Sequence, residues 1–505
     1  MYLLGIDIGT SGTKTALFDT AGNAVASATY EYPLYSPKNG YAEQSPADWW
    51  NAVVSGIKSV LAKSGANKSD IKGIGLSGQM HGLVMLDKAG NVIRNSIIWC
   101  DQRTAKEADE VNARVGHDKL IEITANPAIT GFTAAKILWV RNNEPENFGK
   151  CAHILLPKDY IRYMLTGEFA TEVSDASGMQ LLSVPDRQWS DFVLDKLGID
   201  KSLLGKVYES PEVTGAITKQ VSELTGLAEG TPVVGGAGDN AAAAIGTGVA
   251  EDGKAFTTIG SSGVVFTHTS KISIDKLGRV HTFCAAVPGE WHVMGVTQAA
   301  GLSLKWYRDN FGHGEMETAA QMGTDPYVLM SSGAELSPIG ANKLLYLPYL
   351  NGERTPHLDP NARGVFFGLS TMHTKRDFVR AIMEGVTYSL TDCVNIIRGM
   401  GTITDMAACG GGAASPLWRQ MLADNFSCPV KTMQSKEGPA LGVALLAGVG
   451  TGVWKSVPEA CRATVKSKDT QPPEDANTAE YRKFHEIYKQ LYKDLKGTYA
   501  ALASV

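Results

Sequence analysis

The sequence predicts an α/β protein built from two similar domains, and three observations support this prediction. At 505 residues the chain is too long for one hydrophobic core to be expected. Strand-like apolar segments are interspersed with amphipathic helical segments. A strand, a glycine-rich turn and a second strand occur at 5–14, and the same pattern returns half a chain later at 256–266. Two like hairpins in the two halves indicate a duplicated domain, with a phosphate chain held between the copies.

The first hairpin, GIDIGTSGTK, combines an acid with a turn suited to an anion. Its glycines permit the positive φ angles of a tight turn and let backbone N–H groups approach an anion. Asp7 points toward whatever the turn holds, which is explained if a divalent cation lies between them. Further donors are expected at Thr10, Ser11, Thr13 and Lys14. Taken alone, an ordinary glycine-rich hairpin is the alternative interpretation.

Composition excludes several classes of partner. The chain is 44% hydrophobic and 20% charged, and its net charge of −5 comes without a long basic run. Nucleic acid and anionic membranes are therefore not expected as main partners. No secretory signal is recognised, and no apolar stretch approaches the roughly 18 residues needed to span a bilayer. Seven cysteines occur singly, without a CxxC pair, so we expect reduced thiols and a cytoplasmic protein.

In the first half, helices are expected from Pro46, after a Ser45 N-cap, and at 104–115, 131–145 and 157–167. A buried strand ends at Gln79, Met80 and His81, where the histidine is placed to hydrogen-bond a polyol. The alternative for His81 is a structural role. For Asp101 and Arg103 the alternative is a surface ion pair, and for Lys136 a solvated helix face.

The second concentrated signal is TPVVGGAGDNAAAAIGTG at 231–248. A buried strand ends in small residues that allow very close packing, and Asp239 and Asn240 then open an alanine-rich helix. Asp239 is the candidate general base, because a phosphoryl acceptor hydroxyl needs a positioned proton acceptor. The alternative, which is compatible with that role, is an Asp N-cap. We place a domain boundary after this segment, with domains at 1–248 and 249–452 and a tail at 453–505.

In the second half, helices are expected at 297–311, 374–397 and 437–452, and Glu353 and Arg354 are expected to be exposed at the end of a strand. A third glycine-rich turn follows a strand at 410–412 and suits the plane of a nucleotide base, although a close helix–strand contact is the alternative. None of the three turns is a Walker A or GxGxxG loop. The tail ends in a packed helix whose apolar positions are Tyr481, Phe484, Tyr488, Leu491 and Leu495.

Taken together, these segments resemble the FGGY family of carbohydrate kinases in the actin/hexokinase-like ATPase superfamily. Two family patterns are matched, by GFTAAKILWVRNN at 131–143 and by GVFFGLSTMHTKRDFVRAIME at 364–384, and the likeness extends from Gly5 to about Gly450. Within the family the match is best to members that phosphorylate xylulose, through GQMHG, GAGDNAAAAIGTG and LPYLNGERTPH. The resemblance implies two ribonuclease H-like ATPase domains around a central cleft.

The resemblance also implies roles for individual residues. Met80 and His81 contact the sugar, where glycerol kinases carry a charged pair, and Asp239 with Asn240 supplies the base and a further sugar contact. Asp7 lies near the metal and phosphates. The other substrate-binding candidates are Gln79, Trp99 and Asp101. The ATP-binding candidates beyond the first hairpin are Gly260, Ser261, Ser262, Gly263, Gly410, Gly411, Gly412 and Ala413. The chain departs from the family pattern at Ser261, at Ala414 and in the stretch 424–430.

The expected reaction is phosphorylation of D-xylulose at its terminal C5 hydroxyl, in pentose catabolism, with ATP as donor and Mg²⁺ as cofactor. The alternatives are another FGGY kinase acting on ribulose, rhamnulose, a polyol or a glycerol-like acceptor, and a non-catalytic actin-like ATP-binding protein. A chaperone of the same superfamily would need a peptide-binding domain, for which no stretch is left over. The expected partners are the sugar and ATP, and a homodimer is left open.

Overall fold

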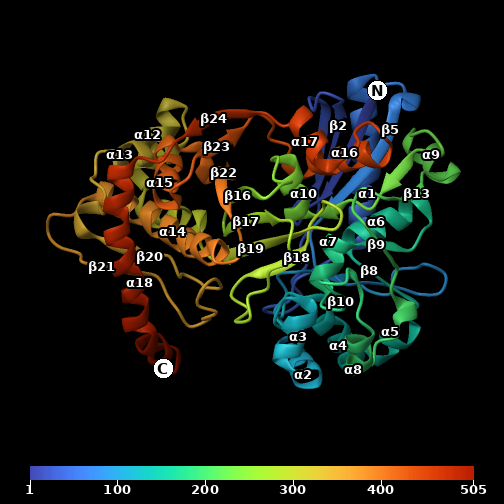
Figure 1. Cartoon of the computed structure of the whole chain (residues 1–505), viewed down its shortest axis with the longest axis horizontal. Coiled ribbons are helices and arrows are strands. Elements are labelled where there is room, and N and C mark those ends of the chain that lie inside the picture. The colour runs from blue at the N-terminus through green and yellow to red at the C-terminus, as the bar shows by residue number, and fades with distance from the viewer.

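The computed structural model describes residues 1–505 and contains two seven-stranded sheets (Figure 1). The first sheet has the order β13-β14-β5-β1-β2-β3, with β15 paired to β5. Its strands are β1 (Tyr2–Ile8), β2 (Gly12–Asp19), β3 (Ala24–Glu31), β5 (Ile71–Gly78), β13 (Val213–Ala216), β14 (Pro232–Val234) and β15 (Ala237–Gly238). The second sheet has the order β18-β19-β17-β16-β22-β23-β24. Its strands are β16 (Gly253–Ile259), β17 (Gly263–Thr269), β18 (His281–Cys284), β19 (Trp291–Thr297), β22 (Ile403–Cys409), β23 (Val430–Met433) and β24 (Ser467–Gln471).

The two sheets repeat one topology. In the first, β1, β2 and β3 run antiparallel in turn, and β5 lies parallel to β1 on its other side. In the second, β16, β17 and β19 form the same antiparallel series, and β22 lies parallel to β16. The predicted hairpins are therefore equivalent elements, and the predicted two-domain α/β fold is confirmed.

The positive φ angles predicted for the glycines of the hairpin turns are wrong. None of Gly9, Gly12, Gly260 and Gly263 has a positive φ. Two of them are required by close approach instead. A Cβ on Gly12 would lie 2.7 Å from the Tyr30 carbonyl oxygen, and a Cβ on Gly263 would lie 2.6 Å from Thr297 Oγ1.

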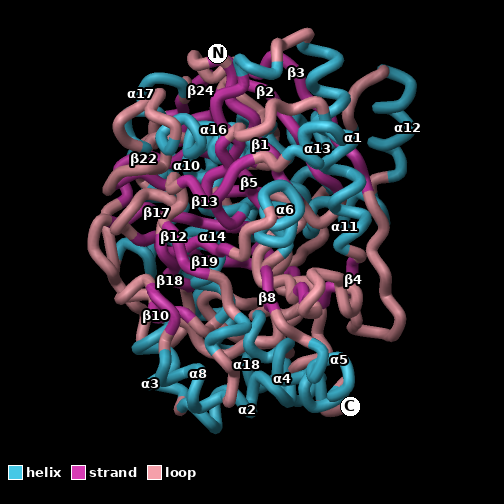
Figure 2. The backbone as a smooth tube through the Cα atoms, turned by 90° about the vertical axis from the view of Figure 1, so that its right-hand side faces the viewer, coloured by secondary structure: helices cyan, strands magenta, loops and turns pink.

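Helices pack on the two sheets, and a further group of helices lies together at one end of the molecule (Figure 2). In the first half they are α1 (Pro46–Ser64), α2 (Ala105–Val115), α3 (His117–Thr124), α4 (Thr133–Asn143), α5 (Pro145–Lys150), α6 (Pro157–Thr166), α7 (Val173–Ala176), α8 (Asp191–Leu197), α9 (Lys219–Thr225) and α10 (Asp239–Gly246). In the second half they are α11 (Gly301–Phe311), α12 (His313–Met322), α13 (Pro326–Glu335), α14 (Lys375–Arg398), α15 (Pro416–Phe426), α16 (Gly438–Gly450), α17 (Val457–Thr464) and α18 (Asp475–Ala503). The helix predicted from residue 297 begins only at Gly301, because β19 extends through Thr297.

Ten further strands form short two-stranded pairs outside the two sheets. They are β4 (Glu43–Gln44), β6 (Val84–Leu86), β7 (Ser96–Ile97), β8 (His153–Leu155), β9 (Ala170–Glu172), β10 (Leu182–Ser183), β11 (Gln188–Trp189), β12 (Lys206–Tyr208), β20 (Leu345–Leu347) and β21 (Val365–Phe367).

Helix α16 joins the two halves of the molecule. Although it lies in the second half of the chain, it packs on β1 and β5 of the first sheet and against α10. A Cβ on Gly5 or Gly75 of the sheet would lie 1.9 Å from a carbonyl oxygen of α16, and one on Gly442 of α16 would lie 1.9 Å from the Ala242 oxygen of α10. The small residues of this helix therefore permit backbone-to-backbone packing. The domain ranges 1–248 and 249–452 stay a prediction.

The C-terminal helix α18 packs on the core of the second half and runs down the left-hand side of the molecule in Figure 1, where it ends at the C-terminus. Tyr481, Tyr488 and Leu491 are buried, while Phe484 and Leu495 are partly buried against the same core. This confirms the predicted apolar face. None of the helices combines the length and the apolar character that crossing a bilayer requires.

Candidate active site

The predicted base and the predicted metal ligand meet at the carboxyl ends of three parallel strands. Asp7 of β1 and Ala237 of β15 both pair with Ser77 of β5, from opposite sides. Because neighbouring strands lie about 4.8 Å apart, the backbones of residues 7 and 237 are about 10 Å apart. Asp239 follows two residues later, so the sheet brings the two carboxylates to the same edge.

The environment of Asp239 is that of a base poised near neutral pH. Burial is the main cause that raises the pKa of Asp239 to about 7, and the nearby charge of Asp7 is the second. Two hydrogen bonds oppose this rise: the backbone N–H and the side-chain amide of Asn240 both donate to Asp239 Oδ1, at 2.7 and 3.0 Å. A general base works best with a pKa near the operating pH. The N-cap interpretation is wrong, because the cap of α10 is Gly238 and Asp239 is the first residue of the helix.

Asp7 has the properties of a ligand to a hard cation. Its Oδ1 is buried and accepts no hydrogen bond, and burial raises the pKa of its carboxyl group. No group of three or more His, Cys, Asp or Glu side chains could hold a metal ion in this structure. Mg²⁺ is commonly held by one or two carboxylates together with substrate phosphates and water. The unpartnered oxygen of Asp7 fits that arrangement.

The first hairpin offers fewer free donors than predicted. The Thr10 hydroxyl accepts from Trp99 Nε1 at 2.9 Å. Thr13 is fully buried, and its hydroxyl is directed to the Tyr32 hydroxyl at 3.4 Å. Lys14 forms an ion pair of 2.6 Å with Glu437, which precedes α16. Ser11 is exposed and has no side-chain partner.

His81 is held as a neutral hydrogen-bond acceptor. Its backbone has a φ of 69°, and its Nδ1 lies 2.9 Å from the Gly178 carbonyl oxygen. Burial, and then the charge of Lys136, place the pKa of His81 well below its usual value. In the neutral ring Nδ1 donates to that carbonyl, so Nε2 carries the free lone pair.

Lys136 lies beneath His81 instead of on a solvated helix face, so that interpretation is wrong. Its side chain is fully buried, and Nζ donates to the carbonyl oxygens of His81 and Gly131, both at 2.8 Å. Burial lowers the pKa of Lys136 to about 7. Lys136 therefore supports the backbone that presents His81.

Met80 and Gln79 connect the end of β5 to the two turns beside it. Met80 is buried against Gly238, where a Cβ would lie 2.9 Å from its Sδ. Gln79 Nε2 donates to Gln44 at 2.7 Å and to the Gly9 carbonyl oxygen at 3.4 Å. Met80 thus packs directly behind the turn that carries Asp239, and Gln79 ties β5 to the first hairpin.

Asp101 is not open to a ligand. It is fully buried, Arg103 donates to both of its carboxylate oxygens at 2.7 to 3.0 Å, and the Ala42 N–H donates at 2.6 Å. The pair is therefore a buried one, and the surface-pair interpretation is wrong. Trp99, by contrast, stays 43% exposed beside Thr10.

A cavity of about 760 Å³ lies between the second hairpin and the third glycine turn. Gly260, Ser261, Gly411 and Gly412 line it, whereas Ser262, Gly263, Gly410 and Ala413 do not. The rest of its wall comes from α11, α13, α14 and the start of α15, and includes Tyr327, Leu302, Ser331, Leu417 and Trp418. Its volume falls within the usual range for small-molecule and cofactor pockets.

The third glycine turn also makes the close contact that was its alternative interpretation. Gly410 has a φ of 81°, and a Cβ on it would lie 2.7 Å from the Ile259 carbonyl oxygen. A Cβ on Gly412 would lie 2.4 Å from Ile259 Cγ2. Of the departures from the family pattern, Ala414 lines the cavity, while 424–430 does not. Ser427 takes the left-handed conformation, with a φ of 49°, that glycine would favour at that helix end.

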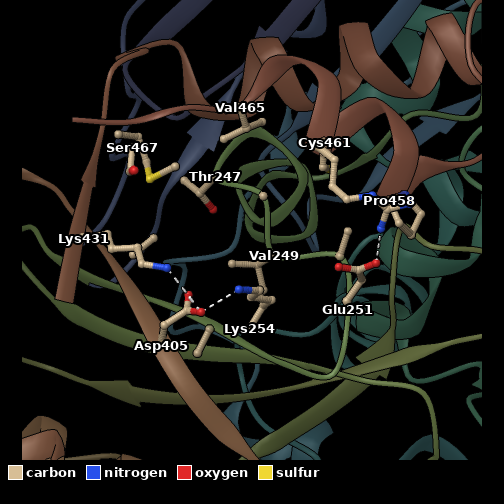
Figure 3. A pocket seen from close by; sticks show the side chains of 16 residues that line it. Thr247, Val249, Glu251, Lys254, Asp405, Lys431, Pro458, Cys461, Val465 and Ser467 are labelled. Carbon is tan, nitrogen blue, oxygen red and sulfur yellow. Dashed lines mark hydrogen bonds and ion pairs between the residues drawn. The ribbon is translucent and has the colours of Figure 1, made fainter. Parts of the chain in front are cut away.

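A second cavity, of about 190 Å³, contains none of the predicted site residues (Figure 3). Lys254 and Lys431 both pair with Asp405, at 2.5 and 3.4 Å, and Arg462 pairs with Glu251. Its charges are therefore already matched within the protein, and we assign it no part in the site.

The sequence interpretation missed a buried charged cluster behind Asp239. Lys158 Nζ lies 2.8 Å from Asp159 and 3.4 Å from both Glu172 and Asp175, and all four side chains are buried. Ser174 Oγ accepts from the Gly238 N–H at 3.1 Å, which links this cluster to the turn carrying Asp239. The signal was present as charges set among apolar or small residues in LLPKDYIRYML and in TEVSDASG.

The repeated sheets, with a carboxylate at the carboxyl ends of the strands and glycine hairpins in both halves, define a duplicated α/β fold of the kind used for phosphoryl transfer. Comparison with known proteins identifies the family. The N-terminal domain of the FGGY family of carbohydrate kinases matches residues 2–246, and the C-terminal domain matches residues 255–451. This chain therefore belongs to the FGGY family of carbohydrate kinases.

Three relatives illustrate its place in that family. Xylulose kinase from Bacillus subtilis is 39% identical over 100% of this chain and 99% of its own. The crystal structure of a xyloylose kinase from Brucella ovis, at 34% identity, has a TM-score of 0.91 over 99% of this chain and 100% of its own. Gluconokinase from Bacillus subtilis is 31% identical over 99% of this chain and 98% of its own.

Proposed function

We propose that this protein transfers the γ-phosphoryl group of ATP to the terminal C5 hydroxyl of D-xylulose, giving D-xylulose 5-phosphate and ADP. Full-length similarity to xylulose kinases supports the sugar. The observation that carries the chemistry is the placement of Asp239, which has a pKa near 7 and follows a strand beside β5, the strand that leads to Met80 and His81.

The sugar contacts follow from the hydrogen-bonding capacities at this edge. The free Nε2 of His81 accepts a hydrogen bond from a sugar hydroxyl, and the amide of Asn240 offers both a donor and an acceptor. Met80 supplies an apolar surface next to the turn. Asp239 accepts the proton of the terminal hydroxyl as the hydroxyl oxygen attacks the γ-phosphorus and the bond to ADP breaks.

ATP would lie between the two hairpins. The 760 Å³ cavity, lined by Gly411 and Gly412, would hold the adenosine. The turn residues Gly260 and Ser261 at its edge, with Ser11 and Thr10 of the first hairpin, would face the phosphates. Lys14 would reach them if its ion pair with Glu437 opened. Closure of the domains at 1–248 and 249–452 would exclude water from the transfer.

Asp7 would hold Mg²⁺ together with the phosphates of ATP. When bound, the ion offsets the negative charge that builds up on the phosphate oxygens. The chain's own contribution is the buried carboxylate oxygen with no other partner, and a second carboxylate nearby at Asp239 that is left free for the proton.

A coupled assay of ADP formation with a panel of acceptors tests the proposal. D-xylulose should give a kcat/KM at least about tenfold above those for D-ribulose, L-rhamnulose, glycerol and D-gluconate, a difference equal to about 1.4 kcal/mol in transition-state binding. D-gluconate is the second candidate because a gluconokinase matches the chain over 99% of its length. Preference for gluconate, or ADP formation that does not depend on any sugar, would contradict the proposal.

A further inference from the structure

Arg354 carries a guanidinium group that no protein group hydrogen-bonds, although the charge of Glu353 acts on it. It is only partly exposed, and its backbone N–H donates to Glu353 Oε1 at 2.8 Å. No hydrogen bond or ion pair joins its guanidinium group to another residue, although that group has five N–H donors. Burial lowers the pKa of Arg354. The donors of this half-buried guanidinium are open to the acceptor atoms of a ligand. The predicted exposure of Glu353 beside it is wrong, since that side chain is 3% exposed.

The residues on either side of Arg354 are anchored to β19. Glu353 accepts from the Gln298 N–H at 2.8 Å and from the Ser389 hydroxyl at 3.2 Å. Thr355 donates its N–H to the Val296 carbonyl oxygen at 3.0 Å, and its hydroxyl accepts from the Val296 N–H at 3.1 Å. These hydrogen bonds on both sides hold the backbone of Arg354 in a set position between the end of β19 and α14.

A chain of contacts connects the loop of Arg354 with the ring of His81. Thr355 also donates its hydroxyl to the Arg279 carbonyl oxygen at 2.7 Å, two residues before His281 on β18. The rings of His281 and Phe132 lie 5.7 Å apart, and those of Phe132 and His81 lie 4.6 Å apart. Burial is the main cause of the low pKa of His281, and the charge of Arg354 is the second cause. The charge of Arg354 also lowers the pKa of His81, as a smaller cause. The guanidinium therefore lies near both rings.

The position of Arg354 relative to Asp239 defines which end of a sugar it would meet. The loop of Arg354 reaches the site through Thr355 and the strand β18, on the side of His281 and His81, whereas Asp239 opens α10 beside Asp7, at the ends of β15 and β1. Arg354 thus belongs to the His81 end of the site. An open-chain ketopentose with its terminal hydroxyl at Asp239 has its carbonyl end directed away from that carboxylate.

We propose that Arg354 is a specificity residue of the second half of the chain, whose guanidinium donates hydrogen bonds to the oxygen atoms at the carbonyl end of the open-chain sugar. The inference rests on the function proposed above. The free N–H donors of the guanidinium suit a carbonyl or a carboxylate oxygen, because these oxygens only accept hydrogen bonds. A hydroxyl group suits them less well, because it can either donate or accept a hydrogen bond.

The test compares wild type with Arg354→Gln, which keeps polarity but removes the charge, in steady-state kinetics with D-xylulose. The KM for D-xylulose should rise about 10- to 100-fold, since a charge-assisted hydrogen bond is lost, while kcat changes less than about threefold. Xylitol, in which a hydroxyl replaces the carbonyl, and D-xylonate, which carries a carboxylate, are then measured as competitive inhibitors. The substitution should weaken D-xylonate at least as much as D-xylulose, and xylitol by less than about threefold.

The controls separate this contact from a structural role and from failure of the proposed function. Arg482→Gln removes an exposed arginine of α18 and should leave all three constants unchanged. If Arg354 only stabilised its loop, the three ligands would weaken equally, and that result overturns the inference, as does an unchanged KM for D-xylulose. If the wild-type enzyme itself forms no ADP with D-xylulose, the proposed function fails instead.

Discussion

Replacing Asp239 by asparagine should stop phosphoryl transfer and, at the same time, stabilise the folded protein. The carboxyl group is buried beside a like charge, so its pKa rises from 3.8 to about 7 on folding. A raised pKa means that the carboxyl group of Asp239 ionises less readily in the folded state than in the unfolded state. Ionised Asp239 therefore lowers the free energy of unfolding, and an uncharged side chain of the same shape removes this loss of stability.

The size and pH dependence of the effect follow from linkage. Below pH 3.8 both states are protonated, and Asp and Asn should be equivalent. As the pH rises from 3.8 to 7, the unfolded carboxyl ionises first, so the native protein loses stability relative to the variant. At 1.36 kcal/mol per pKa unit, the advantage of Asp239→Asn reaches about 1.6 kcal/mol at pH 5 and levels off at about 4 kcal/mol above pH 7. The plateau is an upper bound, because Asp239 keeps some solvent contact.

The assay is urea unfolding of the protein without nucleotide at pH 5 and pH 8, followed by tryptophan fluorescence, together with calorimetric titration of D-xylulose. Sugar binding should remain within about tenfold of wild type, while sugar-dependent ADP formation falls by at least about 10³-fold, the contribution of a general base. Asp109→Asn, at an exposed carboxylate, should change stability at neither pH. A variant that is less stable than wild type at pH 8, or one that keeps substantial turnover, would refute the reasoning.

Three further substitutions test other parts of the structure. Gly75→Ala places a Cβ 1.9 Å from the Val443 carbonyl oxygen of α16, so it should lower the free energy of unfolding, measured by urea titration, by about 3 kcal/mol. The control Gly65→Ala should lower it much less, even though Gly65 has a positive φ, because no atom lies within 4 Å of the added Cβ. Gly411 lines the 760 Å³ cavity and has open space around it, so the side chain of Gly411→Leu extends into the cavity. In the coupled assay the KM for ATP should rise about tenfold or more, while the thermal stability and the KM for D-xylulose stay unchanged. Thr13→Val removes a hydroxyl directed to Tyr32, so it should cost about 1 kcal/mol of stability and leave the KM for ATP within about twofold; a large rise in that KM would restore Thr13 as an ATP ligand.

Much of the site was predictable because its signals are local. A glycine turn between two strands, small residues around Asp239 and helical spacing in the C-terminal tail are patterns within ten to thirty residues of sequence. Each reflects the conformational freedom or the volume of the residues themselves. The predicted helix start at 297 was wrong because local sequence patterns specify the boundaries of elements only loosely. Here the strand β19 ends at Thr297, just before the helix begins.

The sequence by itself determined the duplicated hairpins, the type of each main element and Asp239 as the acid at the mouth of a tight turn. Only the tertiary structure decided which charges are buried and what they meet. Lys136 supports His81 from within the core, Asp101 is occupied by Arg103, and the guanidinium of Arg354 has no hydrogen-bond partner in the protein. The reason is that burial and pairing depend on contacts between segments far apart in the chain, as when β19 anchors the loop of Arg354, and no local pattern of residue types encodes those distances.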